Sequence, residues 1–474
     1  MKEAARQRTK YIVSDLVASL VGFLAFTIIR YDIIKYYLPQ KCASLHSFLL
    51  SPAVVAEIAL IPLLLVFISW LTGFYSSAFY KSRLQVIGNS ILVSFIIMMI
   101  VFLVVLLNDV LPRRLLNYEL MAMLFGLLSV LLMICRLTIA NIDTRAINRG
   151  ERDIYTLMVG ASSEAENLKR RVEKAHNSMG LNIIGCVDLK DGPIVKGNNL
   201  PIIEFDDIAD FCKKNNVRAF ILCPYSKNNE RLMEIANSLL PMNIPIYISP
   251  DLHNPIMARP TFSNVAGEPL IDISRPKSRP GMQNVKRLFD IVVSVLVLIV
   301  LSPLFAIIAV AIKLDSKGPV FYRQPRLGFH RKEFDIVKFR SMRTDAERNG
   351  EHLLSAPDDN RVTKVGRFIR KYRIDELPNF WNVLCGDMSI VGPRPEREFF
   401  AKQILERSPI YALIYAVRPG ITSWGMVKFG YAQNVDEMLE RMRYDLLYLD
   451  NVSITTDIKI MFYTVKTVIT GQGV

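Results

Sequence analysis

The chain has 474 residues, of which 51% are apolar, and a formal net charge of +14. This length predicts two to four folded units, and the gathering of apolar residues in long runs excludes an ordinary soluble protein and predicts a membrane protein. The basic charge favours anionic lipid and phosphorylated substrates as partners, and we expect no interaction with nucleic acid.

Four apolar segments in the first third of the chain each approach the ~20 residues that cross a bilayer. They cover residues 11–29, 49–71, 86–108 and 119–140. We therefore predict a bundle of four transmembrane helices over residues 1–145. Basic residues before the first segment, between the second and third, and after the fourth place both ends of this bundle in the cytoplasm. Asp15 lies near the end of the first segment, where we expect it to be solvated.

The N-terminus and the cysteines indicate an intracellular environment. Nothing at the N-terminus resembles a cleavable signal peptide. The six cysteines form no C-x-x-C pair and the five histidines are scattered. We predict free thiols in a reducing compartment and no zinc site.

Residues 150–273 change character, because short apolar strands alternate with amphipathic helices. This pattern predicts a Rossmann-like module with an open parallel α/β sheet. One strand ends at Gly160, but the following residues, Ala-Ser-Ser-Glu-Ala, lack the other glycines of a dinucleotide fingerprint, and Glu164 puts negative charge where a pyrophosphate would lie. We favour a structural or regulatory module over a working NAD site.

A linker at residues 274–289 precedes a fifth apolar segment, residues 291–312. Both flanks of this segment are basic, so the charge rule places both ends in the cytoplasm. Ser302 and Pro303 lie at its middle, where the proline breaks the helix and the serine hydroxyl can satisfy a freed carbonyl. We predict a re-entrant helix that enters the membrane, bends at Ser302 and Pro303, and returns. Residues 290–474 then form this helix and a mixed α/β catalytic domain.

Two basic elements lead up to the most informative part of the chain. Residues 334–342 alternate enough to predict a strand that presents Lys338 and Arg340 with the same facing. From Thr363 onward, apolar residues recur at helical spacing, which predicts a helix with Arg370 off its apolar face.

Asp375 and Glu376 follow this helix directly and precede the turn Gly392–Pro395, which contains Arg394. Pro378 is tolerated only in a first helical turn, so we predict that a helix starts near Asp375 and favours anionic phosphate at its N-terminus. Adjacent carboxylates on a helix point about 100° apart, so one can attack phosphorus while the other binds Mg²⁺ or handles protons. Taken alone, the same residues also fit ordinary surface charge.

Five motifs together carry a more specific signal. They are Lys338-Phe-Arg-Ser-Met342, Arg370 to Pro378, Gly386-Asp-Met-Ser389, Gly392-Pro-Arg-Pro395 and Arg418-Pro-Gly-Ile-Thr422. This set resembles the bacterial sugar transferase signature of the polyprenyl-phosphate hexose-1-phosphate transferases (monotopic phosphoglycosyl transferases). The bundle and the α/β module resemble the long form of that family. Residues 422–427 depart from its commoner Thr-Gly-Trp-x-Gln-Val form, which leaves the preference for sugar or nucleotide open.

The resemblance implies a two-step phosphoryl transfer. Asp375 would attack the β-phosphate of a UDP-sugar and release the nucleoside monophosphate, and undecaprenyl (polyprenyl) phosphate would then accept the sugar phosphate. Glu376 would assist, and Asp375 and Glu376 would be the Mg²⁺ ligands. Phosphate oxygens would be held by Lys338, Arg340, Arg370 and Arg394.

The resemblance also implies a place and a pathway. The enzyme would be a multi-pass protein of the bacterial inner (cytoplasmic) membrane, with its catalytic domain facing the cytoplasm. It would be a homodimer in contact with the lipid bilayer, and it would start a surface polysaccharide such as a capsule, an O-antigen or an exopolysaccharide. Glucose and galactose are both open as the sugar. The alternatives are a membrane-anchored nucleotide-sugar dehydratase and a non-enzymatic scaffold for polysaccharide assembly.

Overall fold

The computed structural model divides the chain into two compact units. The first contains residues 1–152 and 279–285, and the second contains residues 153–278 and 286–474. The residues described are 2–37, 44–76, 81–106, 114–149, 153–160, 163–174, 180–189, 200–223, 229–248, 271–272, 280–344, 360–430 and 432–469.

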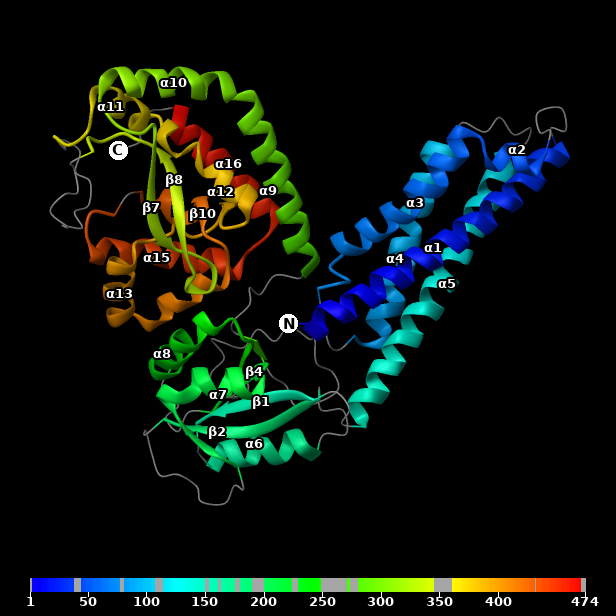
Figure 1. The fold of residues 1–474 in the computed structure, drawn as a ribbon, viewed down its shortest axis with the longest axis horizontal. Helices are drawn as coiled ribbons and strands as arrows, with labels where there is room; N and C mark the ends of the chain where they lie inside the picture. Colours follow the sequence, from blue (N-terminus) through cyan, green and yellow to red (C-terminus); the bar gives the residue numbers. More distant parts are fainter. Residues whose placement is uncertain are drawn as a thin grey trace. The chain divides into compact units, whose positions relative to one another are not determined.

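The first unit is a bundle of long apolar helices. Its helices are α1 (Lys2–Tyr37), α2 (Leu45–Leu49), α3 (Pro52–Leu71), α4 (Arg83–Val101), which continues as the π-helix η2 (Phe102–Leu106), and α5 (Arg114–Asn148). Among the described residues, four helices are long and apolar enough to cross a membrane, and their spans are Ala5–Tyr37, Pro52–Leu71, Arg83–Val105 and Leu115–Ile147. The predicted four-helix bundle is confirmed in number and order, and its first and last helices are longer than the apolar runs (Figure 1).

A buried ion pair ties the four long helices together. Arg136 of α5 donates to both carboxylate oxygens of Asp15 in α1, at 2.8 and 2.7 Å, and neither side chain is exposed. The same guanidinium donates to Ser69 of α3 at 2.8 Å and to Asn89 of α4 at 3.0 Å. Tyr75 donates its hydroxyl to Asp15 at 2.6 Å. The expectation that Asp15 is solvated was therefore wrong, because a partner 121 residues away turns inward and neutralises it.

The α/β module contains one six-stranded sheet in the order β3-β2-β1-β4-β5-β6. The strands are β1 (Ile154–Val159), β2 (Leu181–Asp188), β3 (Ile202–Glu204), β4 (Ala219–Leu222), β5 (Ile246–Ile248) and β6 (Ile271–Asp272). All neighbouring pairs are parallel except β5 with β6. The predicted parallel sheet is confirmed, and its order is that of a doubly wound dinucleotide-type fold.

In the described part of this module, the helices are α6 (Ser163–Lys174), α7 (Ile208–Asn215) and α8 (Asn229–Leu239), with 3-10 turns η3 (Phe205–Asp207) and η4 (Leu240–Met242). The first strand is almost continuously apolar and buried, as expected for a strand covered on both faces. Gly160 follows it with a φ of 116°. The next two residues of the broken fingerprint, 161 and 162, lie outside the described part of the chain.

The apolar segment that follows the predicted linker is a broken helix. Helix α9 (Pro280–Val300) and helix α10 (Ser302–Asp315) are bent by 60° relative to each other at Leu301 (Figure 1). Pro303 lies in the first turn of α10, and the Ser302 hydroxyl donates to the Ile299 carbonyl at 2.8 Å. The break therefore falls at the predicted residues. Helix α9 begins within the predicted linker, so residues 280–289 are helical, and residues 273–279 lie outside the described part.

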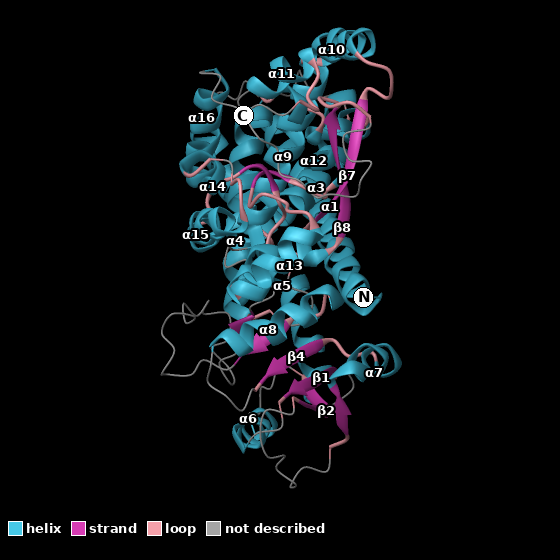
Figure 2. Ribbon diagram, turned by 90° about the vertical axis from the view of Figure 1, so that its left-hand side faces the viewer, coloured by secondary structure: helices cyan, strands magenta, loops and turns pink. Residues whose placement is uncertain are grey.

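The catalytic domain is built around two small sheets. Strands β7 (Phe321–Leu327) and β8 (Glu333–Phe339) form an antiparallel hairpin around the turn η5 (Phe329–Arg331) (Figure 2). Strand β9 (Ser389–Val391) pairs in parallel with β10 (Gly420–Thr422). The helices are α11 (Lys364–Lys371), α12 (Asn379–Cys385), α13 (Glu398–Arg407), α14 (Trp424–Lys428), α15 (Val435–Asp450) and α16 (Ile454–Ile469). Turns η6 (Ile374–Glu376) and η7 (Pro409–Ala416) complete it.

The Asp15 pair makes a testable contribution to the stability of the bundle. Arg136→Met leaves the carboxylate of Asp15 buried without its main partner, so we expect the free energy of unfolding to fall by about 3 kcal/mol or more. Adding Asp15→Leu removes the stranded charge and should restore much of the loss. The measurement is unfolding of the full chain in detergent micelles. Arg8→Met on exposed surface of α1 is the matched control and should change little.

Candidate active site

The β7–β8 hairpin presents Lys338 to a carboxylate from a different part of the chain. The Lys338 amine donates to Oε1 of Glu376 at 2.6 Å. Strand β8 is held in place by Asn382 of α12, whose side-chain oxygen accepts from the Val337 N–H at 3.1 Å and whose amide donates to the Asp335 carbonyl at 2.8 Å. The open edge of β8 is thus satisfied by a side chain, and the position of Lys338 follows from this pairing.

A tight reversal of the chain carries the two acidic residues into the domain. Helix α11 starts at the N-cap Thr363, whose side chain accepts from the Gly366 N–H, and it places Arg370 in its last turn. Arg373 then adopts a left-handed conformation with a φ of 53°. Asp375 and Glu376 lie in the following 3-10 turn, and α12 begins only at Asn379. The prediction of a helix starting near Asp375 was therefore wrong by one turn, because the reversal at Arg373 needs its own short turn.

Glu376 is buried and electrostatically neutralised. Its side chain is 7% exposed, and besides Lys338 it has the Nη1 atom of Arg394 at 3.6 Å from the same oxygen. Burial by itself raises the pKa of Glu376, but the charges of Lys338, Arg394 and Arg373 outweigh it and hold the pKa well below its ordinary value. Glu376 therefore stays ionised and anchors two cations.

Asp375 has a different environment although it is the adjacent residue. Burial, and then the negative charge of Glu376, raise the pKa of Asp375 to about 6, against the opposing effect of Lys338, Arg370 and Arg394. Within the described part of the chain, its carboxylate is engaged by no hydrogen bond and no ion pair of 4.0 Å or less. A buried carboxylate that is only partly compensated is a reactive group with a free oxygen.

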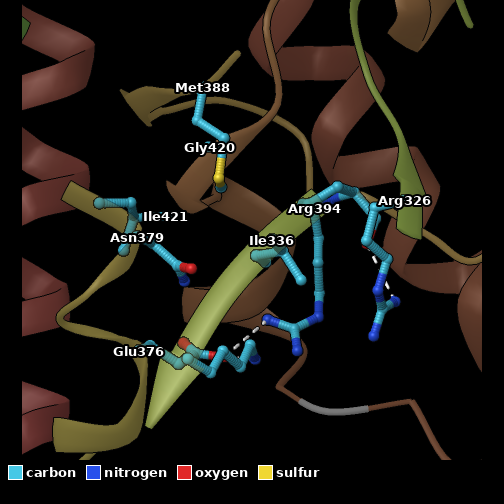
Figure 3. Close-up of a pocket in the computed structure, with 10 residues that line it drawn as sticks. Arg326, Ile336, Glu376, Asn379, Met388, Arg394, Gly420 and Ile421 are labelled. Carbon is cyan, nitrogen blue, oxygen red and sulfur yellow. Dashed lines mark hydrogen bonds and ion pairs between the residues drawn. The ribbon is translucent and has the colours of Figure 1, made fainter. Parts of the chain in front are cut away.

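Arg394 reaches the site from a turn that two glycines make possible. Gly392 comes directly after strand β9 and two residues before Arg394, and its N–H donates to the carbonyl of Thr422 in β10 at 3.0 Å. A Cβ at Gly392 would lie 2.4 Å from the Arg418 carbonyl oxygen, and one at Gly420 would lie 2.1 Å from the Gly392 nitrogen. From this turn the Arg394 side chain extends towards Glu376 (Figure 3). Met426 supports it from behind, with its sulfur 3.1 Å from Nη1.

These groups open into a cavity of about 430 Å³, a volume typical of a small-molecule site. Its lining contains nine cationic and three acidic side chains. The cations are Arg326, Lys338, Arg340, Arg343, Arg361, Arg370, Arg394, Arg397 and Arg441, and the acids are Asp375, Glu376 and Glu396. A cavity with this balance attracts polyanions such as diphosphates.

The structure brings five of the six predicted site residues to one place and gives the sixth another contact. Lys338, Arg370 and Arg394 act on Asp375, together with Glu376. Arg340 lines the same cavity, but its guanidinium donates to the carbonyls of Ser316 and Lys317, both at 2.7 Å, at the end of helix α10. The predicted strand stops at Phe339, so Arg340 does not share the facing of Lys338.

Three charged residues that line the cavity, Glu396, Arg326 and Arg441, were not predicted from the sequence. Glu396 is buried and accepts from Arg441 of α15, with Arg326 of β7 at 3.8 Å. Glu396 directly follows the Arg394 turn and could have been noticed for that reason. Arg326 lies outside the five motifs. Arg441 is 45 residues from Glu396 in the sequence, on a helix without a motif. Only the folded chain brings them to the cavity.

Few side chains at this site could bind a divalent metal ion. Among the described residues, no group of three or more His, Cys, Asp and Glu side chains is arranged to hold a metal ion. Mg²⁺, however, commonly takes one or two protein carboxylates and completes its shell with substrate phosphates and water. Asp375 and Glu376 fit such a partial set, which a phosphate substrate would complete.

Comparison with known proteins agrees with this geometry. The sequence profile of the bacterial sugar transferase family matches residues 281–471, and that of a CoA-binding domain matches residues 71–250. The UDP-glucose:undecaprenyl-phosphate glucose-1-phosphate transferase of Escherichia coli is 30% identical over 346 residues, which are 72% of this chain and 73% of that protein. The chain belongs to the bacterial sugar transferase family.

Two other relatives match a smaller share of their own length. The undecaprenyl-phosphate glucose phosphotransferase of Komagataeibacter xylinus is 34% identical over 65% of this chain and 58% of that protein. The UDP-N-acetylgalactosamine-undecaprenyl-phosphate N-acetylgalactosaminephosphotransferase of Aeromonas hydrophila is 44% identical over 40% and 44%. This chain thus spans about half the length of these two relatives. A solved structure of RSP, a Rex-family repressor, is 16% identical over 36% of this chain and 83% of that one, with a TM-score of 0.20, which carries no argument.

The family match covers the five predicted site residues that the structure brings together. Lys338, Arg370, Asp375, Glu376 and Arg394 all lie within residues 281–471. The predicted family is therefore confirmed, and the five quoted motifs fall in the matched region.

Replacing Asp375 and replacing Glu376 should change the stability of the protein in opposite directions. The raised pKa of Asp375 means that its ionised form is disfavoured in the folded state, so Asp375→Asn should stabilise the protein above about pH 6. A rise from 3.8 to about 6 corresponds to about 3 kcal/mol as an upper figure. The gain should shrink as the pH falls below 6 and vanish below about 4, where the Asp375 carboxyl is protonated in both states. Chemical unfolding of the catalytic domain at pH 7.5 and pH 4 measures it.

Glu376→Gln is the matched comparison. The pKa of Glu376 is lowered, so its ionised form stabilises the fold at pH values above the ordinary glutamate range. We expect this variant to lose about 3 kcal/mol at pH 7.5, because Lys338 and Arg394 are left buried without their partner. Equal effects of the two substitutions would contradict the difference between the two carboxylates.

Proposed function

We propose that this chain transfers a hexose 1-phosphate from a UDP-sugar to undecaprenyl phosphate and so starts the synthesis of a surface polysaccharide. The observation that carries the proposal is the contrast between the two buried carboxylates. Glu376 is neutralised by Lys338 and Arg394, whereas Asp375 has a pKa of about 6 and no bound partner among the described residues. Glu376 fixes the two cations in place, and Asp375 is available to react in the lining of a cationic cavity.

In the first step, an oxygen of the ionised Asp375 attacks the phosphorus that carries the sugar. A bond forms between this oxygen and the phosphorus, and the bond from the phosphorus to the bridging oxygen breaks. Its electron pair leaves with UMP, so neither an oxidant nor a proton donor is required. Lys338, Arg370 and Arg394 are placed to offset the negative charge of the phosphate oxygens, which is the main demand of phosphoryl transfer.

In the second step, a phosphate oxygen of undecaprenyl phosphate attacks the same phosphorus. The aspartyl oxygen to phosphorus bond breaks, Asp375 returns as a carboxylate, and the product is undecaprenyl diphosphate sugar. A carboxylate with a pKa of about 6 suits both steps, because it is ionised at neutral pH and is a good leaving group. When bound with the diphosphate, Mg²⁺ held by Asp375 and Glu376 would supply further charge neutralisation.

We also propose that helices α9 and α10 form a re-entrant membrane segment. The support comes from the two ends of the pair. In the first half of α9, Arg287 donates to the carbonyls of Val383 and Leu384 at 2.5 and 2.9 Å, and Asp290 accepts from Ser389 at 2.8 Å. At the other end, Arg340 binds the last turn of α10. Because one folded domain holds both ends, both ends belong on one side of the bilayer.

The exposed faces of the two helices agree with membrane insertion. Val300 is 69% exposed, Ile307 66% and Leu314 83%, and such apolar surface is stable in hydrocarbon and costly in water. We therefore propose that the protein lies in the bacterial cytoplasmic membrane with its catalytic domain facing the cytoplasm, and the basic residues at the ends of the bundle support this orientation. The homodimer stays a prediction.

Topology is tested with single cysteines in a cysteine-free chain. Lys332→Cys lies on exposed surface of the catalytic domain, and His46→Cys lies on the exposed loop helix α2. A membrane-impermeant thiol reagent should label His46→Cys in intact cells and Lys332→Cys only after the membrane is opened. Labelling of Lys332→Cys in intact cells would show that α9 and α10 cross the membrane, contrary to the proposal.

The reaction is tested with a panel of UDP-sugars containing glucose, galactose and N-acetylgalactosamine, with Mg²⁺ and undecaprenyl phosphate. The parent protein should release UMP with one of them, and mass spectrometry after omission of the lipid should find a sugar phosphate on the peptide that contains Asp375. Asp375→Asn should abolish both signals, since an amide is a poor nucleophile.

Asp335→Asn, an exposed aspartate on strand β8, is the control and should behave like the parent. Glu376→Gln should slow the reaction by at least about a hundredfold without removing the group that is modified. The proposal fails if Asp375→Asn forms lipid-linked sugar phosphate at the parent rate.

A further inference from the structure

The buried face of helix α10 packs against three segments that each contain part of the reaction centre. Ile308 and Ile312 of α10 form one apolar cluster with Phe339 at the end of β8 and Ile369 of α11, and Ile374 of the turn η6 packs against it. Phe305, one turn earlier on α10, meets Phe339 edge to face with ring centroids 5.4 Å apart. Helix α10 is thus the common support of a strand, a helix and a turn.

Each of these three supported residues is next in sequence to a residue of the reaction centre. The pairs are Phe339 with Lys338, Ile369 with Arg370, and Ile374 with Asp375. Because neighbouring Cα atoms are a fixed 3.8 Å apart, a shift of α10 relative to the cluster changes the backbone that carries all three functional groups. The cluster is buried and close-packed, so such a shift cannot be absorbed by empty space.

Arg340 fastens strand β8 to the end of α10. Its Nη1 atom donates to the Lys317 carbonyl at 2.7 Å, and its Nη2 atom donates to the Ser316 carbonyl at 2.7 Å and to the Ser316 hydroxyl oxygen at 2.9 Å. Ser316 and Lys317 directly follow the last residue of α10, so the guanidinium binds the backbone where the chain leaves the helix. Gly318 has a φ of 135°, and a Cβ there would lie 1.8 Å from Nη1 of Arg340. The chain therefore has a glycine where the guanidinium must pass.

Asp315 fastens helix α11 to the same end of α10. One of its carboxylate oxygens accepts from the N–H of Val365 at 3.0 Å. Val365 is in the first turn of α11, where backbone N–H groups lack helical partners and a negative charge is favourable. The last residue of the membrane helix thus holds the helix that carries Arg370. Two polar contacts, from Arg340 and Asp315, act together with the apolar cluster.

We propose that Arg340 and Asp315 are positioning residues, which hold Lys338, Arg370 and Asp375 at a set depth relative to the membrane helix α10. This inference rests on the proposed function. The outward face of α10 is apolar, with Ile307, Val310 and Leu314 more than half exposed, so the hydrocarbon fixes the depth of the helix. The phosphate of a lipid substrate lies at a depth set by the same bilayer. The two contacts bring the attacking carboxylate and the lipid phosphate to one level.

The test uses the full-length protein in nanodiscs of phosphatidylethanolamine and phosphatidylglycerol. Arg340→Gln and Asp315→Ala should each lower the rate constant for UMP release about 10- to 100-fold, the loss expected from a small misplacement of reacting groups, with little change in the KM for the UDP-sugar. Asp315→Asn keeps an oxygen that accepts from the Val365 N–H, so it should recover most of the rate. Arg323→Gln, an exposed arginine on the neighbouring strand β7, is the matched control and should match the parent.

Hydrogen exchange supplies a measurement that does not depend on activity. In Arg340→Gln and Asp315→Ala, the backbone amides of α11 should exchange faster, while those of α15 stay protected as in the parent. The inference is overturned if both variants match Arg323→Gln in UMP release and in exchange of α11. It is also overturned if α11 and α15 lose protection equally, because the residues would then support the whole fold only. A parent protein that releases no UMP with any sugar would instead overturn the proposed function, and the exchange results would still decide on the contacts to α10.

Discussion

The active site depends on the neutralisation of Glu376 by Lys338 and Arg394. Two adjacent carboxylates that are both buried would repel each other and lose their hydration, which is a large cost unless cations are close. The contacts of Glu376 with Lys338 at 2.6 Å and with Arg394 at 3.6 Å make this burial tolerable. Asp375 is then free of close partners among the described residues, and burial raises its pKa to about 6. The result is a buried carboxylate with a raised pKa in the lining of a cationic cavity.

The cations arrive from separate segments, and each segment is held by a backbone contact of its own. Asn382 pairs with the edge of β8 and sets Lys338, and the close approach of Gly392 to β10 sets Arg394. Both contacts satisfy polar groups that would otherwise be buried unpaired. Lys338 and Arg394 are therefore held by contacts of the fold itself, as electrostatic stabilisation of a phosphoryl group requires.

Buried charges in the membrane segments are also paired with groups from other parts of the chain. Asp15 and Arg136 are both fully buried in the bundle, and each is tolerated because the other neutralises it. Helix α10 instead keeps an apolar outer face and uses Arg340 and Asp315 only at its end, where polar groups meet the catalytic domain. For Asp15, Arg136 and Arg340, the buried charge has a partner that the fold holds in place.

Local sequence features determined the number of candidate membrane helices, the parallel α/β sheet, the break at Ser302 and Pro303, and the family to which the motifs around Asp375 and Glu376 belong. These features depend on residues close together in the sequence, namely on the length of apolar runs, on strand and helix periodicity and on proline. They can therefore be predicted from local sequence patterns. The pairing of Asp15 with Arg136, the diversion of Arg340 to helix α10 and the placement of Arg441 beside Glu396 were decided only by the tertiary structure. Each depends on a partner at least 24 residues away, and the strength of a charge contact follows distance in space, which no local pattern encodes.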